Sequence, residues 1–281
     1  MEDSLDSQIS KSWGDYLDGG WALLPVVAVI GGAWAFAVPL HNGRWTELAA
    51  ALALVLGGWC PLWRALTHTD WATPISRWRT WDRNEALPRW PYLQPGTPGA
   101  ALHHTLALAR SWWQAVGQAA LTAPVRSAAL SLLVSVLIGV ILGRAALLLT
   151  LLLASWAEMA VLWHAGRGRA GTGWAAVALV GAPWLLGASL AEVEMALPFL
   201  SAFVLTLLMG LYAAPSPLAA GGPLLAASFL IWSGHFVAAG ALMLLALPGL
   251  MLLLHRPDTQ EYRQAVTPWL LAMLLLVAWV L

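Results

Sequence analysis

Residues able to bind a phosphorylated ligand gather in one segment, residues 67–99. The candidate ligand-binding residues of this segment are Asp70, Arg77, Asp82, Arg83, Glu85 and Arg89. Carboxylates are ligands that Mg²⁺ prefers, and arginine forms paired hydrogen bonds with phosphate oxygens. The segment therefore predicts a site for a phosphorylated ligand. Two alternatives stay open: the charges pair with one another, or the arginines only set the orientation in a membrane.

Glu158 is a seventh candidate, because it lies within an otherwise apolar stretch. A carboxylate at membrane depth is costly and by default indicates a functional role. The alternative is a protonated acid, or one whose carboxylate reaches the nearby polar end at His164. The sequence has no P-loop, HExxH, GxSxG or CxxC motif, so catalytic residues stay unassigned. Cys60 is the only cysteine, and no metal site is predicted.

The composition indicates that these residues are positioned by a protein embedded in lipid. Hydrophobic residues make up 60% of the 281 residues and charged residues only 10%. A soluble domain carries about 25% charged residues. The formal net charge is zero, which gives no attraction to nucleic acid. We therefore expect one integral membrane domain over residues 1–281, with membrane lipids as its surroundings.

Length arithmetic predicts an all-α bundle of about nine membrane spans. Residues 127–164 and 219–255 are apolar blocks too long for one span, since each helix would be about 55 Å long against a core of about 30 Å. We expect the first to fold back at Gly143-Arg144 and the second near Ser233-Gly234-His235. The other five predicted spans are Trp21–Leu40, Thr46–Leu66, Thr172–Leu190, Ala196–Tyr212 and Val266–Leu281.

The positions of the basic residues predict a cytoplasmic N-terminus. With nine spans threaded from inside, twelve of the fourteen lysines and arginines fall on the cytoplasmic side, and only Arg44 and Arg144 fall outside. Tryptophans near many span ends fit interfacial anchoring. We expect the protein to lie in a bacterial cytoplasmic membrane.

Residues 67–125 form a long cytoplasmic loop in this interpretation, rich in arginine and tryptophan. Within it, residues 100–121 have an apolar face of Leu102, Leu106, Ala109, Trp113 and Val116 at three- and four-residue spacing. This pattern predicts an amphipathic helix on the cytoplasmic surface of the bilayer, with a shallow tenth span as the alternative.

The layout resembles the UbiA superfamily of intramembrane prenyltransferases. The stretch 124–189 (PVRSAALSLL to APWLLGAS) looks like the third to fifth helices of that family, and 261–281 (EYRQAVTPWLLAMLLLVAWVL) looks like its last helix. The resemblance implies nine spans, a basic loop after the second, and Mg²⁺-dependent transfer from a prenyl diphosphate held by two aspartate-rich motifs.

The chain departs from the UbiA pattern at both motifs. The first region offers only Asp70 and Asp82, without the NDxxD pattern, and the second, GLYAAPSPLAAGGP, has no acid. The chain is thus interpreted as a divergent or degenerate member that binds a polyprenyl or other lipid-tailed ligand, with enzymatic activity left open and Mg²⁺ as cofactor only if transfer occurs. The alternatives are a non-catalytic accessory or scaffold subunit that binds other membrane subunits, and a transporter.

Overall fold

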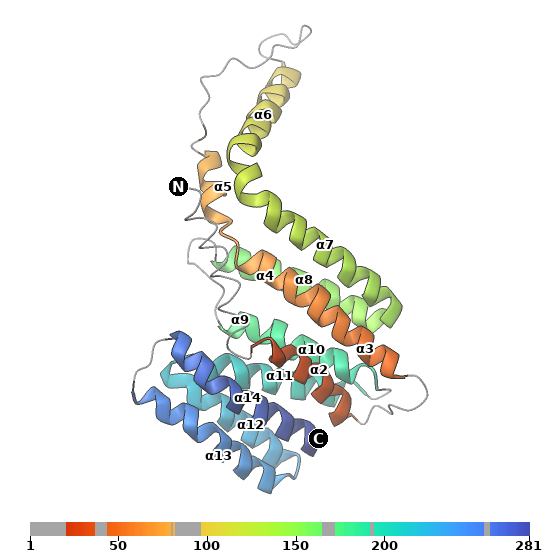
Figure 1. Cartoon of the computed structure of the whole chain (residues 1–281), viewed down its shortest axis with the longest axis vertical. Helices are drawn as coiled ribbons and strands as arrows, with labels where there is room; N and C mark the ends of the chain where they lie inside the picture. Colours follow the sequence, from red (N-terminus) through yellow and green to blue (C-terminus); the bar gives the residue numbers. More distant parts are fainter. Residues whose placement is uncertain are drawn as a thin grey trace.

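The computed structural model describes residues 21–36, 44–79, 81, 97–164, 172–191, 194–255 and 259–281. Every element in this part of the chain is a helix, which confirms the predicted all-α class (Figure 1). The helices are α2 (Leu23–Ala35), α3 (Arg44–Leu54), η1 (Val55–Trp59), α4 (Cys60–Thr67), α5 (Ala72–Arg79), α6 (Pro98–Trp112), η2 (Trp113–Gly117), α7 (Gln118–Leu142), α8 (Arg144–His164), α9 (Thr172–Ala176), η3 (Val177–Gly181), α10 (Ala182–Ala188), α11 (Ala196–Tyr212), η4 (Pro217–Ala220), α12 (Gly221–Trp232), α13 (Phe236–Leu253) and α14 (Thr259–Val280).

Five of the described helices are long and apolar enough to cross a membrane. They are Arg44–Thr67, Pro98–Leu142, Arg144–Trp163, Phe236–Leu253 and Glu261–Val280. Four further helices are apolar but shorter, namely Leu23–Ala35, Gly173–Ala188, Ala196–Tyr212 and Pro217–Trp232. These properties are consistent with an integral membrane protein, while the count of nine spans stays a prediction.

Both predicted breaks in the overlong apolar blocks are confirmed. Helix α7 ends at Leu142 and α8 begins at Arg144, and Gly143 between them has a φ of 103°. Helices α12 and α13 are separated by Ser233, Gly234 and His235, and Gly234 has a φ of 90°. Glycine adopts positive φ without the steric cost that a Cβ would add. Each break reverses the chain, because α7 packs on α8 and α12 packs on α13.

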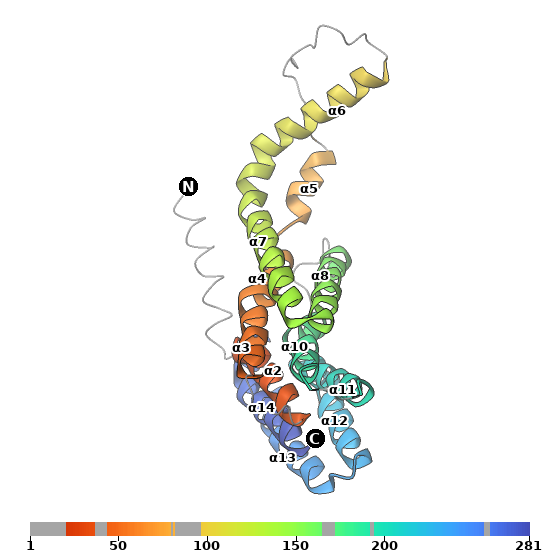
Figure 2. The same ribbon diagram turned by 90° about the vertical axis from the view of Figure 1, so that its right-hand side faces the viewer.

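The helix predicted over residues 100–121 is continuous with the following span helix. Residues 98–142 form one continuous helix, in which the π-helical turn η2 joins α6 to α7. Residues 98–125, expected to belong to a loop with its own helix, are therefore joined to the span helix without a break, and whether they lie on the membrane surface stays a prediction. The helix bends sharply where α6 meets α7, as both views show (Figures 1 and 2). A π-turn is a known cause of such bends, which explains why the helix turns without ending.

Two more π-turns, η1 and η3, each lie just before a proline. Pro61 is the second residue of α4, and Pro183 is the second residue of α10. A proline inside a helix lacks an N–H, and its ring clashes with the carbonyl four residues earlier. Widening the preceding turn moves that carbonyl away from the ring, so the helix can continue past the proline.

The apolar helices pack in chain order into a closed ring. Helix α2 contacts α3, the α3–α4 helix contacts α7, α7 contacts α8, and α8 contacts α10. Helices α11 to α14 follow in the same manner, and α14 returns to pack on α2. Helices α2 and α10 also make an extensive contact across the ring, which divides it into two halves.

The contact between α2 and α10 depends on glycines that allow the two backbones to meet. A Cβ added at Gly32 would collide with the carbonyl oxygen of Trp184 and lie 3.1 Å from the backbone nitrogen of Ala188. A Cβ added at Gly187 would collide with the carbonyl oxygen of Val29. Small residues at helix crossings are how membrane helices achieve close van der Waals packing.

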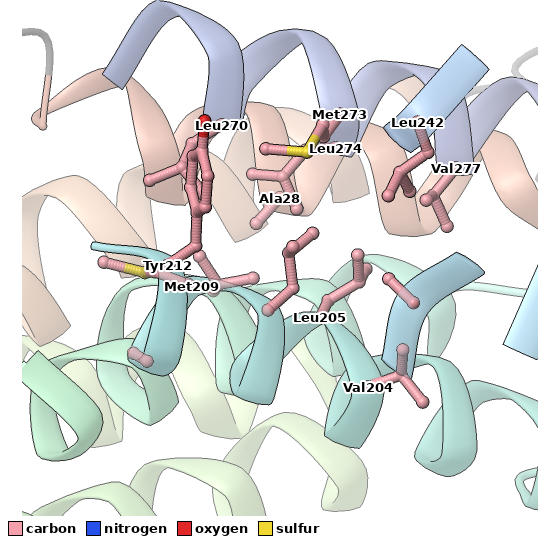
Figure 3. Close-up of a cluster of buried hydrophobic side chains, with 14 of the residues drawn as sticks. Ala28, Val204, Leu205, Met209, Tyr212, Leu242, Leu270, Met273, Leu274 and Val277 are labelled. Atoms are coloured by element: carbon pink, nitrogen blue, oxygen red, sulfur yellow. The ribbon is translucent and has the colours of Figure 1, made fainter. Parts of the chain in front are cut away.

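Two buried apolar clusters fill the two halves of the ring. The larger lies among α2, α9–α10 and α11 to α14, and Figure 3 shows its centre, where Leu205 and Met209 of α11 face Leu270 and Met273 of α14. The smaller lies among α2, α3–α4, α8 and α9–α10. Within it, the Trp59 Nε1–H donates to Thr150 Oγ1 at 3.0 Å, so the buried indole is paired.

Contacts between helix ends show that successive helices alternate in direction. At one end, the Tyr212 hydroxyl of α11 donates to the Ala246 carbonyl of α13 at 2.9 Å, and the Tyr262 hydroxyl of α14 donates to the Tyr212 carbonyl at 3.0 Å. We call this the Tyr212 end. At the opposite end, Arg44 Nη1 at the start of α3 donates to the Leu190 carbonyl just after α10 at 2.7 Å. We call this the Arg44 end.

Candidate functional site: a tryptophan cluster between α5 and α6

Helix α5 carries two of the predicted ligand-binding residues beyond the end of α4. The Trp71 Nε1–H donates to the Leu66 carbonyl at 2.7 Å, which ties the start of α5 to α4. Asp70 Oδ1 accepts a hydrogen bond of 3.1 Å from the Thr73 backbone N–H. An acid here satisfies a free N–H of the first helical turn and interacts favourably with the helix dipole. Asp70 therefore has a structural role in starting α5, whether or not it also binds a ligand.

Arg77 lies near the other end of α5, on its exposed surface. It is separated from Asp70 by seven residues, or about two helical turns. The predicted residues Asp82, Arg83, Glu85 and Arg89 lie outside the described residues. The structure thus places Asp70 just before α5 and Arg77 within it, and it leaves their relation to the other four residues untested.

A cluster of four tryptophans joins α5 to the bend between α6 and α7. We call Trp78, Trp81, Trp112 and Trp113 the tryptophan cluster. The Trp81 Nε1–H donates to Ser111 Oγ at 3.1 Å, and Ser111 in turn donates to the Leu108 carbonyl at 2.8 Å. The rings of Trp78 and Trp112 meet edge to face at 5.8 Å between centroids. Such aromatic pairs contribute about 0.5–1.5 kcal/mol beyond their burial.

Trp112 has a buried Nε1–H for which the described residues provide no hydrogen-bond partner. A buried donor left unpaired costs about 1–3 kcal/mol, so native proteins seldom keep one without a reason. The neighbouring Trp113 ring lies where a side chain at Gly117 would have to be, since an added Cβ would come within 2.6 Å of it. Gly117 thus allows Trp113 to pack against the π-turn, and the turn holds the cluster at the bend.

Glu158 is not part of this cluster. Helix α8 buries a stripe formed by Ala146, Thr150, Leu153, Ala157 and Ala160. Glu158 lies outside the stripe and is exposed on the outward surface of the helix, as is Leu162 one turn later. The hypothesis that Glu158 joins the loop acids around one ligand therefore gains no support from the described residues.

A packed tyrosine pair joins the end of α11 to α14. Tyr212 and Tyr262 are both fully buried, and their hydroxyls donate to the carbonyls of Ala246 and Tyr212. Beside them, the Arg263 guanidinium stacks over the Trp21 ring at 5.8 Å. Residues 210–223 contain no carboxylate that could bind a metal.

The described residues, which exclude Asp82 and Glu85, do not fit the Mg²⁺ that the resemblance implies. In the part of the chain that the structure describes, no group of three or more histidines, cysteines, aspartates or glutamates comes together. Mg²⁺ bound to a diphosphate is usually held by one or two carboxylates per ion. The second motif region supplies none, and Asp70 already caps α5.

Sequence reasoning missed the pairings that build this site. Trp81 and Ser111 are thirty residues apart, and the unpaired Trp112 N–H depends on the packing of α5 against α6. The only available signal was the density of tryptophan in residues 71–113. Comparison with known proteins adds nothing further, because no family model, curated protein or solved structure matches the chain.

Proposed function

We propose that this protein is a UbiA-like integral membrane protein that binds the phosphorylated head group of a lipid-tailed ligand at the tryptophan cluster, without transferring its prenyl chain. Nine spans, a cytoplasmic N-terminus and a cytoplasmic Tyr212 end complete the proposal. The unpaired Trp112 Nε1–H is the observation that carries it, because it is a donor without an acceptor beside an arginine-bearing helix.

The charge distribution among the described residues supports this orientation. Arg44 and Arg144 lie at the Arg44 end, where α3 and α8 begin. Arg64 in the last turn of α4, Arg263 near the start of α14, Arg77 on α5 and Arg110 on α6 lie at the Tyr212 end, which gives four arginines there against two at the Arg44 end. An excess of arginine marks the cytoplasmic side of membrane proteins.

The head group is expected to be a phosphate or a diphosphate. Phosphate oxygens accept hydrogen bonds from indole N–H groups and from guanidinium groups, and hydrogen bonds to charged partners contribute about 1.5–3 kcal/mol. The exposed Arg77 on α5 is within the same short helix as Trp78, whose ring touches Trp112. Prenyl transfer is not proposed, because the tyrosine pair occupies the region where the second metal-binding motif would be.

Binding can be measured with the purified full-length protein in nanodiscs by thermal shift and native mass spectrometry. The probes are a polyprenyl phosphate, a polyprenyl diphosphate and the corresponding alcohol, each with and without Mg²⁺. We expect the two phosphorylated lipids to stabilise the protein, by about 2.7 kcal/mol at a hundredfold excess over Kd, and the alcohol to have little effect. Equal effects of all three probes, or no binding, would refute the head-group site, and diphosphate release would show that the protein is an enzyme.

Trp112→Phe is expected to weaken binding of the phosphorylated lipids at least tenfold, because one hydrogen bond to a charged group is lost. Without ligand, Trp112→Phe should remove no hydrogen bond, since the Nε1–H has no partner among the described residues. The melting temperature of the ligand-free variant should therefore stay close to that of the wild type. Trp163→Phe is the matched control, because Trp163 is 65% exposed and lies on α8 away from the cluster. Ligand affinity that is unchanged in Trp112→Phe would remove this indole from the site.

A second function, as an accessory subunit of a membrane complex, is favoured by the position of Glu158. A carboxylate on the outward surface of a membrane helix faces lipid unless another protein covers it, and such residues usually face protein or water. The wild-type protein and Glu158→Gln can be purified from their native membrane in mild detergent and compared by native mass spectrometry. A partner retained by the wild type and lost by Glu158→Gln would support this function, and a monodisperse monomer in both would count against it.

A further inference from the structure

Helix α6 projects away from the rest of the molecule at the Tyr212 end. In both views it leaves the direction of α7 at a sharp bend and extends beyond the packed helices (Figures 1 and 2). Thr97 begins it, because its Oγ1 accepts the Ala100 N–H at 3.3 Å and Pro98 follows at the first helical position. Helix α6 thus has a capped start of its own, and its axis runs at a steep angle to the axis of α7.

An exposed apolar stripe runs along α6 on the side away from α5. Leu102, Leu106 and Trp113 are 64%, 60% and 40% exposed, and their spacing places them on one face. Ser111 lies on the opposite face, where it accepts the hydrogen bond from Trp81. Trp81 and Trp78 contact α6 only at Ser111 and Trp112, so the stripe is available to another surface.

The bend lies at the depth expected for the lipid head groups. Helix α8 rises about 31 Å from Arg144 to His164, which is one hydrocarbon thickness. Counting about 31 Å back along α7 from Leu142 reaches the neighbourhood of residue 122. Gly117, the last residue of the π-turn, is then about 8 Å further out, which matches the head-group layer. A helix that turns sideways there lies along the membrane surface.

The charge of this region favours an anionic surface. Residues 67–126 carry six arginines (77, 79, 83, 89, 110 and 126) and three acids (70, 82 and 85), a difference of plus three. No acid occurs between Glu85 and Glu158, so nothing on α6 repels an anionic lipid. Arg110 is exposed on the flank of the apolar stripe. Each arginine near an anionic leaflet contributes about 1 kcal/mol of attraction.

We propose that α6 is a membrane-surface helix that inserts Leu102, Leu106 and Trp113 into the cytoplasmic leaflet and binds anionic phospholipids beside Arg110. The occupant of the stripe is thus the lipid surface rather than a second copy of the chain. The inference uses the orientation proposed above, but it does not depend on the phosphorylated ligand, because Leu102 and Leu106 lie on the face of α6 opposite Ser111, which Trp81 contacts, and only Trp113 belongs to both the stripe and the tryptophan cluster.

The test places a polarity-sensitive fluorophore on either face of α6. Cys60 is the only cysteine and is buried, so Cys60→Ser provides the background. Leu106→Cys labels the stripe, and His104→Cys, exposed on another face, is the matched control. The full chain is reconstituted in nanodiscs of phosphatidylcholine, with or without phosphatidylglycerol. We expect spin-labelled lipid to quench position 106 several-fold more than position 104, and aqueous iodide to give the reverse order.

The anionic preference is tested with the same label. Lipid quenching at position 106 should increase when phosphatidylglycerol is present, and Arg110→Glu should remove that increase. Arg144→Glu, an exposed arginine at the Arg44 end, should leave it unchanged. Iodide quenching that is equal at both positions would overturn the membrane contact. Protection of position 106 from both quenchers would also overturn it, because a protein would then cover the stripe. Quenching that is independent of lipid charge would overturn the anionic preference.

Discussion

Gly187→Leu is expected to destabilise the protein by more than about 3 kcal/mol, at or beyond the upper end of the usual cost of overpacking. Even the Cβ would collide with the Val29 carbonyl oxygen, and it would lie 2.9 Å from the Ala33 backbone nitrogen. Both obstacles are backbone atoms of α2, so no change of rotamer can relieve the collision. Helices α2 and α10 would have to separate, and their contact joins the two halves of the ring. Folded proteins have a net stability of only about 5–15 kcal/mol, so the loss should be evident in expression and melting.

The measurement is fluorescence-detected gel filtration and thermal melting in one detergent. Gly240→Leu is the matched control, because Gly240 is an exposed residue of α13 with nothing within 4 Å of an added Cβ. That variant should fold, and leucine is favoured over glycine in a helix by up to about 1 kcal/mol. If Gly187→Leu elutes and melts like Gly240→Leu, the close contact between α2 and α10 is wrong.

Tyr212→Ala is expected to cost about 3–5 kcal/mol, as for other large-to-small substitutions of buried aromatic residues. The ring is fully buried at the meeting point of α11, α13 and α14. A cavity would form there, and the hydrogen bond from its hydroxyl to Ala246 would be lost. Tyr212→Phe keeps the ring and removes only that bond, so it should cost about 0.5–1.5 kcal/mol.

Phe203→Ala provides the control for Tyr212→Ala, since Phe203 lies on the same helix but is 61% exposed. Its loss should change the melting temperature far less. Equal destabilisation by Tyr212→Ala and Phe203→Ala would show that the tyrosine pair does not hold the Tyr212 end together. A Tyr212→Phe variant as unstable as Tyr212→Ala would assign the effect to the hydrogen bond instead of the ring.

The sequence alone predicted the features that local chemistry controls. The all-α class follows from the hydrophobic composition and the scarcity of charge. The breaks at Gly143 and Gly234 follow from helix length, because an apolar block longer than the membrane has to reverse and glycine permits the reversal. The tryptophan-rich and arginine-rich segment was predicted to hold a ligand because its composition differs from the rest of the chain, and that site stays a prediction.

Other features depended on contacts between residues far apart in the sequence. The continuity of residues 98–142 was missed because Gln114, Gln118 and Arg126 interrupt the hydrophobic pattern, whereas the helix continues through the π-turn at Trp113–Gly117. The closure of the ring by α14 on α2 leaves no local signal either. Of the candidate site, Asp70 caps the start of α5 and Arg77 lies near its end, whereas Glu158 faces outward from α8.

For this protein, the sequence by itself determined which segments are helical and apolar, where two of them reverse, and where the arginines gather. Those properties depend on each residue and its near neighbours. Only the tertiary structure decided that Trp81 would pair with Ser111, that the Trp112 N–H would be buried without a partner, and that α6 would turn its apolar stripe away from α5. These outcomes depend on how helices pack against one another, and packing is set by the shapes of surfaces that form only when the chain folds.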